Sequence, residues 1–218
     1  MTDPFDARKA RAAAWFRELR DQIVAAFEAL EDRYGTGAPG RFEVTPTTRA
    51  DGGGGLMSVM RGGRVFEKVG VNVSEVHGTL GERAQKAMAA RGVPGMDTDP
   101  RFWASGISLV AHMVNPHAPA VHMNTRMFWT PHAAWFGGGS DLNPAIEYAE
   151  DTAYFHGQMQ AACDLHDPGY FPKFKAWADE YFFVPHRGRA RGVGGIFYDD
   201  LHTCLLYTSD AADDLTRV

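Results

Sequence analysis

The 218-residue sequence has only two cysteines, Cys163 and Cys204, which are too few for a disulfide framework and fit a reducing compartment. It has no run of basic residues, and its net charge of −5 argues against nucleic acid as a partner. No apolar run approaches the length that spans a membrane, and residues 1–14 are too charged for a signal peptide. These absences predict a cytoplasmic protein that binds neither nucleic acid nor a membrane.

Two common kinds of motif are missing as well. The glycine run 52–55 is not followed by Gly-Lys-Ser/Thr, and no dinucleotide-binding fingerprint is present. The nine histidines include no His-Glu-x-x-His or comparably spaced metal motif. Spacing alone therefore identifies neither a phosphate-binding loop nor a metal site.

Hydrophobic residues (44%) and charged residues (22%) occur in the proportions of a globular protein, and the length suits one domain. Periodicity and capping residues predict helices over 5–34, 82–90, 143–165 and from about 172 to before Pro185. Strands are predicted over 56–60, 65–73, 133–136 and 192–198, and a connector over 35–55. The predicted fold class is α+β, with a large, mostly antiparallel sheet flanked by α-helices.

The most informative segment is a predicted β-hairpin over 108–128, whose arms meet at the turn Asn-Pro-His-Ala-Pro. In a register centred on the histidine of that turn, His112 lies opposite His122 and Ser108 lies opposite Arg126. Because side chains alternate between the faces of a strand, the polar residues share one face: Ser108, His112, His122, Asn124 and Arg126. The opposite face, which holds Thr125 among apolar residues, is predicted to face the core.

This polar face has two readings, since it is either a solvated side of an antiparallel sheet or a functional surface. It contains no Lys or Glu, the residues that are usual on a solvated face. An arginine fork suits carboxylate recognition, and imidazoles suit proton transfer or metal ligation. The pattern alone leaves both readings open.

Other polar residues follow predicted strands. The glycines 137–139 are predicted to form a sharp turn that places Asp141 at a strand end, either as a functional carboxylate or as a turn cap. The acidic pair 199–200 is either an acid pair at a strand end or part of a turn, and a turn is the more common reading. The arginines of the 187–191 loop are either solvated or face an anionic ligand.

Five segments, taken in order, resemble the oxygen-dependent coproporphyrinogen III oxidases: GGG (53–55), RGGRVFEKVGVNVSEVHG (61–78), 106–128, WFGGGSDLNP (135–144) and YFFVPHRGRARGVGGIFYDDL (181–201). The resemblance covers the chain up to about Thr203, and several long motifs in the same order make it specific. It implies oxidative decarboxylation of two propionates of coproporphyrinogen III, which gives protoporphyrinogen IX in haem biosynthesis. It also implies dioxygen as oxidant, no organic cofactor, and a homodimer at full length.

The resemblance assigns roles to individual residues. It marks His122 as proton donor, Asp141 as acceptor for the pyrrole N–H groups, and Arg126 as the fork that positions propionates. Substrate contacts are implied for Ser108, Asn124, Thr125 and Arg126. The positions of divalent-metal ligands in bacterial members correspond to His112, His122, His156 and His186. The decarboxylation with dioxygen as oxidant does not itself require a metal.

Residues 204–218 show none of the pattern of the family, so we expect an incomplete oxidase domain over 1–203 and a disordered or artefactual tail over 204–218. Missing later strands would leave an open sheet edge and a looser site, so we expect this polypeptide to fold poorly or to have little activity. Two other interpretations stay open. One is an inactive tetrapyrrole-binding fragment, and the other is a different metal-dependent oxygenase that uses the histidine cluster.

Overall fold

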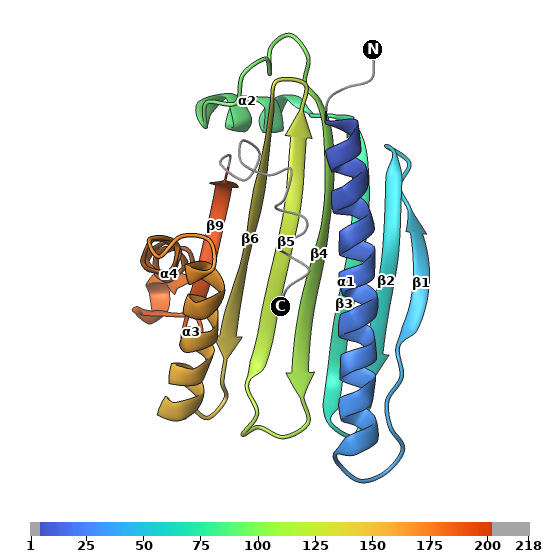
Figure 1. Cartoon of the computed structure of the whole chain (residues 1–218), viewed down its shortest axis with the longest axis vertical. Helices are drawn as coiled ribbons and strands as arrows, with labels where there is room; N and C mark the ends of the chain where they lie inside the picture. Colours follow the sequence, from blue (N-terminus) through green and yellow to red (C-terminus); the bar gives the residue numbers. More distant parts are fainter. Residues whose placement is uncertain (1–4, 202–218) are drawn as a thin grey trace.

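The computed structural model describes residues 5–201, which form a seven-stranded antiparallel sheet in the order β1-β2-β3-β4-β5-β6-β9 (Figure 1). Its strands are β1 (Glu43–Thr48), β2 (Gly53–Arg61), β3 (Phe66–Thr79), β4 (Arg101–Met113), β5 (Ala120–Thr130), β6 (Ala133–Asn143) and β9 (Gly195–Leu201). The helices are α1 (Asp6–Arg33), α2 (Glu82–Ala90), α3 (Ala149–Asp164) and α4 (Tyr170–Tyr181). Two short strands, β7 (Phe183–Val184) and β8 (Arg189–Ala190), pair with each other around a 3-10 turn, Pro185–Arg187. The predicted α+β class is confirmed.

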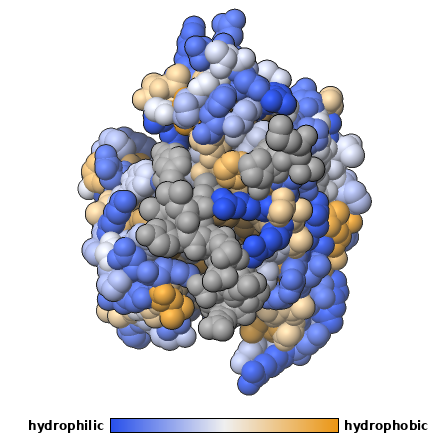
Figure 2. Space-filling model, turned by 45° about the horizontal axis from the view of Figure 1, so that its top comes forward, coloured by the Kyte–Doolittle hydropathy of each residue, from blue (hydrophilic) through white to orange (hydrophobic). Residues whose placement is uncertain are grey.

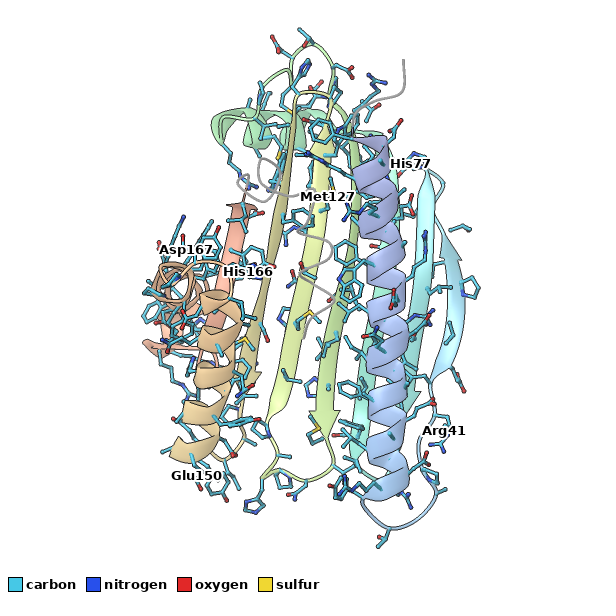
Figure 3. The ribbon with its side chains drawn as sticks, viewed as in Figure 1. Arg41, His77, Met127, Glu150, His166 and Asp167 are labelled. Carbon is cyan, nitrogen blue, oxygen red and sulfur yellow. The ribbon has the colours of Figure 1, made fainter. Side chains whose placement is uncertain are left out.

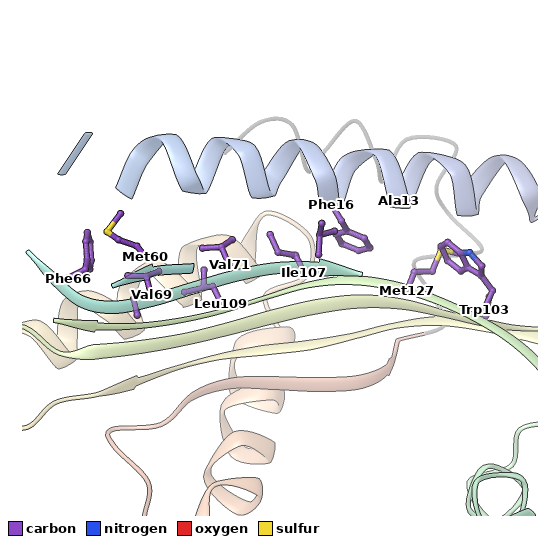
Figure 4. Close-up of a cluster of buried hydrophobic side chains, with 13 residues drawn as sticks. Ala13, Phe16, Met60, Phe66, Val69, Val71, Trp103, Ile107, Leu109 and Met127 are labelled. Carbon is purple, nitrogen blue, oxygen red and sulfur yellow. The ribbon is translucent and has the colours of Figure 1, made fainter. Parts of the chain in front are cut away.

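One face of the sheet carries the main core. Helix α1 lies lengthwise across β3 and β4 (Figure 1), and its residues Ala13 and Phe16 belong to the same buried cluster as side chains of the strands (Figure 4). These strand residues include Val71, Ile107 and Met127. Burial alternates strictly along β4, since odd-numbered positions from 103 to 111 are buried and the even-numbered ones are not. The open face of the sheet, opposite α1, is therefore free to hold polar side chains.

The register of the central hairpin differs from the predicted one by two residues. The observed pairs are Ser108–Asn124 and Val110–His122, in place of the predicted Ser108–Arg126 and His112–His122, which are wrong. The turn is centred one residue earlier than predicted, and Asn115 organises it. The Asn115 side chain accepts a hydrogen bond from the backbone N–H of His117 at 3.0 Å, and its carbonyl accepts one from Ala118 at 3.0 Å. An even shift leaves each side chain on its predicted face, so the division into two faces is confirmed.

The predicted glycine turn after residue 136 is wrong. Strand β6 continues through residues 137–139, so Asp141 lies inside the strand rather than at its end. None of the three glycines has a positive φ. A Cβ at any of them would lie 2.4–2.7 Å from an atom of a neighbouring strand. These glycines thus permit close approach between strands rather than a change of direction.

Several other helix and strand boundaries also differ from the predicted ones. The predicted connector 35–55 contains the exposed edge strand β1 and the start of β2, which its Gly, Pro and Thr content concealed. Because β6 extends to Asn143, α3 begins at Ala149 instead of residue 143. Asp199, predicted to lie in a turn, is inside β9. The predicted tail 204–218 lies outside the described residues.

The C-terminal end of α1 is fixed by a buried carboxylate that the sequence did not reveal. The side chain of Glu31, 0% exposed, accepts hydrogen bonds of 2.8–2.9 Å from the backbone N–H groups of Gly40, Arg64, Val65 and Phe66. Burial raises the pKa of this carboxyl, but the four amides outweigh burial and hold the pKa below its ordinary value. Close by, at the lower end of α1 in Figure 3, Arg41 forms an ion pair with Asp32 at 2.5 Å.

The face of the molecule shown in Figure 2 is largely hydrophilic. On the face shown in Figure 2, hydrophobic residues form small separate patches. Glu150 and His166 lie near opposite ends of α3 (Figure 3), which illustrates how polar groups cover the helices. Within residues 5–201, no helix is both long and apolar enough to cross a membrane.

Candidate active site

A pocket of about 310 Å³ lies on the open face of the sheet, over β5, β6 and β9. From the sheet it is lined by His122, Asn124, Arg126, Gly139, Phe197 and Asp199. Its remaining wall consists of Tyr181, Phe182 and Arg191, from the end of α4 and the following loop. Side chains alternate between the two faces along β5, so three predicted polar residues line this pocket: His122, Asn124 and Arg126. Met123 and Met127, between them in the sequence, point toward the core.

A larger cavity, of about 420 Å³, lies between α1 and strands β1–β3. It contains none of the predicted site residues. Its charged groups neutralise each other, because Arg17 binds Glu75 at 2.6 Å. The smaller pocket on the open face is therefore the better candidate.

The side chain of Asp141 sits beneath this pocket, on the neighbouring strand from His122. It is 0% exposed, and its Oδ1 accepts a hydrogen bond from Nδ1 of His122 at 2.8 Å. With the proton assigned to Nδ1, Nε2 of His122 is free to accept, and the amide of Asn124 lies 3.4 Å from it. The imidazole thus links a buried carboxylate to the pocket.

The second oxygen of Asp141 is held as firmly as the first. Oδ2 accepts hydrogen bonds from Asn143 at 2.6 Å and from Arg191 at 2.8 and 3.2 Å. Burial raises the pKa of Asp141, but the hydrogen bonds from His122 and Asn143 and the charge of Arg191 together hold the pKa below its ordinary value. Asp141 is therefore an ionised carboxylate in a buried position.

Arg126 lies at the other end of the pocket and shares the carboxylate of Asp199 with Arg91. Its Nη2 is 3.1 Å from Oδ2 of Asp199, and its Nη1 donates to Oδ1 of Asn124 at 3.3 Å. Arg91, the C-cap residue of α2, places its own Nη2 3.0 Å from the same oxygen of Asp199. Two guanidinium groups therefore contact the same oxygen of this carboxylate.

Two other predicted substrate residues have different positions. Ser108 lies on the open face of β4, directly opposite Asn124, and is exposed. Thr125 points to the opposite side of the sheet, where its hydroxyl shares a hydrogen bond of 3.2 Å with the hydroxyl of Tyr198. The structure thus brings Ser108 to the pocket side of the sheet but not the side chain of Thr125.

The four predicted metal-ligating histidines do not form one group. His112 is exposed on β4, diagonal to His122 across the hairpin, and His186 lies in the 3-10 turn. On α3, His156 donates from Nε2 to the carbonyl of Val193 at 3.0 Å. Throughout residues 5–201 no three His, Cys, Asp or Glu side chains are gathered as a metal ion requires. These histidines are therefore not assembled into a ligand set in the described structure, and a bound metal stays a prediction.

Gly137 makes room for the ion pair of Arg126. A Cβ at this position would lie 2.4 Å from Oδ1 of Asp199 and 3.0 Å from Nη2 of Arg126. We therefore expect Gly137→Ala to displace this pair and to weaken binding of a carboxylate ligand roughly ten-fold, measured by titration. Gly157→Ala is the matched control, because nothing lies within 4 Å of a Cβ there, and its affinity should stay unchanged. Equal affinities of the two variants would contradict this role of Gly137.

Comparison with known proteins shows which family the chain resembles. The family model of coproporphyrinogen III oxidase matches residues 11–217. The chain belongs to the coproporphyrinogen III oxidase family. An oxygen-dependent coproporphyrinogen-III oxidase of Rickettsia bellii is 49% identical over 194 residues, 88% of this chain and 67% of the relative. A protein of the same name from Rickettsia akari is 46% identical over 192 residues, 87% and 66% of the two chains. The chain thus spans about two thirds of the length of these relatives.

Membership of the coproporphyrinogen III oxidase family is the part of the prediction that the comparisons confirm. The matched range runs past Thr203, and the domain boundary at that residue stays a prediction. Two charged residues that line the pocket are not assigned to the site by the sequence: a turn is the favoured interpretation for Asp199, and Arg191 is left as either solvated or facing an anionic ligand. The sequence gives no signal for Arg91, which contacts Asp199. The only sequence signal of Asp199 and Arg191 is a charged residue beside a strand or helix end, which is not specific.

Proposed function

We propose that this chain catalyses the reaction for which its relatives are named, the oxygen-dependent oxidative decarboxylation of coproporphyrinogen III to protoporphyrinogen IX in haem biosynthesis. The observation that carries the proposal is a pocket with a buried, ionised Asp141 linked through His122 at one end and Arg126 at the other. Each step would convert one propionic acid side chain and one dioxygen into a vinyl group, carbon dioxide and hydrogen peroxide. Dioxygen takes up both electrons, so no organic cofactor is needed.

Arg126 is suited to bind a propionate of the substrate. Its side chain is 38% exposed at the pocket, and Asn124 and Asp199 hold it in place. A planar guanidinium can bind a carboxylate through two parallel hydrogen bonds, which fixes the direction of the propionate as well as its position. Such positioning brings the reacting carbon close to the groups at the other end of the pocket.

His122 is suited to move the proton. Its Nε2 faces the pocket while Nδ1 donates to Asp141, so the ionised carboxylate stabilises the imidazolium whenever Nε2 takes up a proton. The predicted role of Asp141 as acceptor for pyrrole N–H groups would require Asn143 or Arg191 to release one of its oxygens. We therefore assign Asp141 first to the orientation and charge balance of His122.

The shape of the open face suits a broad macrocycle. Gly106 and Gly137 flank Arg126 on adjacent strands, and Gly139 lies opposite Asn124. These positions present backbone instead of side chains on the pocket side of the sheet, so a flat or saucer-shaped ligand can approach closely. Phe197 and Tyr181, stacked at 4.2 Å, supply an apolar wall.

Incubation of the 218-residue chain with coproporphyrinogen III in air tests the proposal. We expect carbon dioxide and protoporphyrinogen IX, the latter detected as protoporphyrin fluorescence after oxidation, and no product without dioxygen. Binding without release of carbon dioxide would support the tetrapyrrole-binding fragment instead. Activity that a chelator abolishes and iron restores would support the metal-dependent oxygenase. A homodimer and a cytoplasmic location stay predictions.

Arg126→Gln tests the binding step separately from catalysis. Loss of one charge-assisted contact should weaken binding of coproporphyrin III by about 1.5–3 kcal/mol, roughly 10- to 100-fold. The stable, coloured porphyrin can be titrated by absorbance without turnover. Arg49→Gln, an exposed arginine beside the β1–β2 turn, is the control and should bind as the wild type does. Unchanged affinity in Arg126→Gln would remove this residue from the substrate site.

A further inference from the structure

A carboxylate of the chain itself already contacts the arginine that we assign to the substrate. Oδ2 of Asp199 lies 3.1 Å from Nη2 of Arg126, and both residues line the pocket. The side chain of Asp199 is only 13% exposed, whereas that of Arg126 is 38% exposed. A substrate carboxylate that enters the pocket therefore meets Arg126 as one half of an existing ion pair.

The backbone of β9 places Asp199 against Arg126. The pairing of β9 with β6 shifts at Gly137, where residues 199–200 together lie opposite this single glycine. A bulge of this kind redirects a side chain, and Gly137 leaves the space for it, because a Cβ there would lie 2.4 Å from Oδ1 of Asp199. Within the described part of the chain, Oδ1 is buried without a hydrogen-bond partner. Asp199 thus acts on the pocket through Oδ2.

Asp199 has a second ion pair that keeps it beside the pocket. The same Oδ2 lies 3.0 Å from Nη2 of Arg91, the C-cap residue of α2. When a ligand carboxylate binds Arg126, Asp199 can therefore stay in place, and two carboxylates then lie on one guanidinium group. Like charges at such a short distance repel each other, so the presence of Asp199 opposes binding of the ligand carboxylate.

We propose that Asp199 is a specificity-determining residue that competes with a substrate carboxylate for Arg126. The inference rests on the proposed function, in which a propionate of coproporphyrinogen III binds Arg126. Once that propionate has become a vinyl group, Asp199 regains Arg126 without competition, because a neutral vinyl group forms no ion pair with a guanidinium. Asp199 thereby weakens binding of the substrate and favours release of the decarboxylated product.

The alternative role of Asp199 is to hold Arg126 in place for the ligand, and the two roles predict opposite effects. Asp199→Asn removes the charge and keeps an oxygen that can accept from Arg126. Competition predicts that this variant binds coproporphyrin III roughly five- to ten-fold more tightly than the wild type in an absorbance titration. A holding role predicts weaker binding. Gly137→Ala is not equivalent, because its methyl group would displace the guanidinium as well as the carboxylate.

Combination with Arg126→Gln shows whether the effect of Asp199 passes through Arg126. In that background no guanidinium is left to compete for, so Asp199→Asn should change the affinity by less than about two-fold. Asp32→Asn, which removes an exposed carboxylate from its ion pair with Arg41, is the matched control and should bind as the wild type does. In turnover, Asp199→Asn should lower KM for coproporphyrinogen III without raising kcat, because binding of the substrate itself is strengthened.

Three results would show that the inference is wrong even though the proposed function stands: unchanged binding by Asp199→Asn, weaker binding, or a gain that persists in the Arg126→Gln background. A wild type that binds no coproporphyrin III would refute the proposed function and the inference together. Should Asp199→Asn not fold, Asp199→Ser takes its place, since serine also lacks the charge and is smaller than aspartate. The same gain in affinity is expected of it, and the same three results overturn the proposal.

Discussion

Replacement of Asp141 by asparagine is expected to reduce oxygen-dependent turnover by about 10²- to 10⁴-fold, the usual contribution of a positioned acid or base. An amide at this position cannot balance an imidazolium at His122, and it leaves the guanidinium of Arg191 without its buried counter-charge. Binding of coproporphyrin III should change much less, because Arg126 and Asp199 at the other end of the pocket are untouched. Initial rates at saturating substrate, compared with porphyrin titrations, separate the two effects.

The control for this experiment is Asp179→Asn on α4, an exposed carboxylate paired with Lys175. It removes the same charge outside the site, so its turnover should equal that of the wild type. A pH profile adds a readout that a purely structural role would not move. Because the pKa of Asp141 is depressed, its charge supports His122 at all pH values above the ordinary pKa of 3.8 and is lost only in stronger acid. Wild-type turnover in Asp141→Asn would remove the carboxylate from the mechanism.

The two faces of the central hairpin could be predicted because the face of a side chain depends only on whether its position along the strand is odd or even. His122 and Asn124 lie two residues apart, so any even shift in register keeps them on the same face. The register itself depends on the turn at Asn115, where local hydrogen bonds favour one geometry over another of similar length. Periodicity carries no information on that choice, and the predicted pairs were consequently wrong.

The ion pairs of the pocket could not be predicted for a different reason. Asp199 meets Arg91 only because the sheet places β9 near the end of α2, 108 residues away in sequence. Nothing in the neighbouring sequence distinguishes Asp199 from a turn residue. The glycines of β6 were likewise assigned to a turn, since a requirement for close approach to another strand has the same local composition as a bend. Family resemblance located the site but not these contacts.

Glu31→Gln is expected to lower the free energy of unfolding by about 3 kcal/mol. Glutamine offers one oxygen to the four backbone N–H groups that now share two, and its own amide hydrogens would face some of these donors. These groups connect the end of α1 to the β2–β3 turn, so the loss affects two elements at once. Chemical denaturation at neutral pH measures it, with Glu18→Gln, exposed on the same helix, as the control.

The same pair of proteins predicts a pH dependence with a definite sign. The pKa of Glu31 is lower in the folded state than its ordinary value of 4.5, so the ionised carboxylate stabilises the fold above that value. This stabilisation is lost as the pH falls from 4.5 through the folded-state pKa, and wild type and Glu31→Gln should therefore converge in stability in acid. A difference that stays constant down to the acid limit would mean that the shape of the side chain, rather than its charge, holds the four amides.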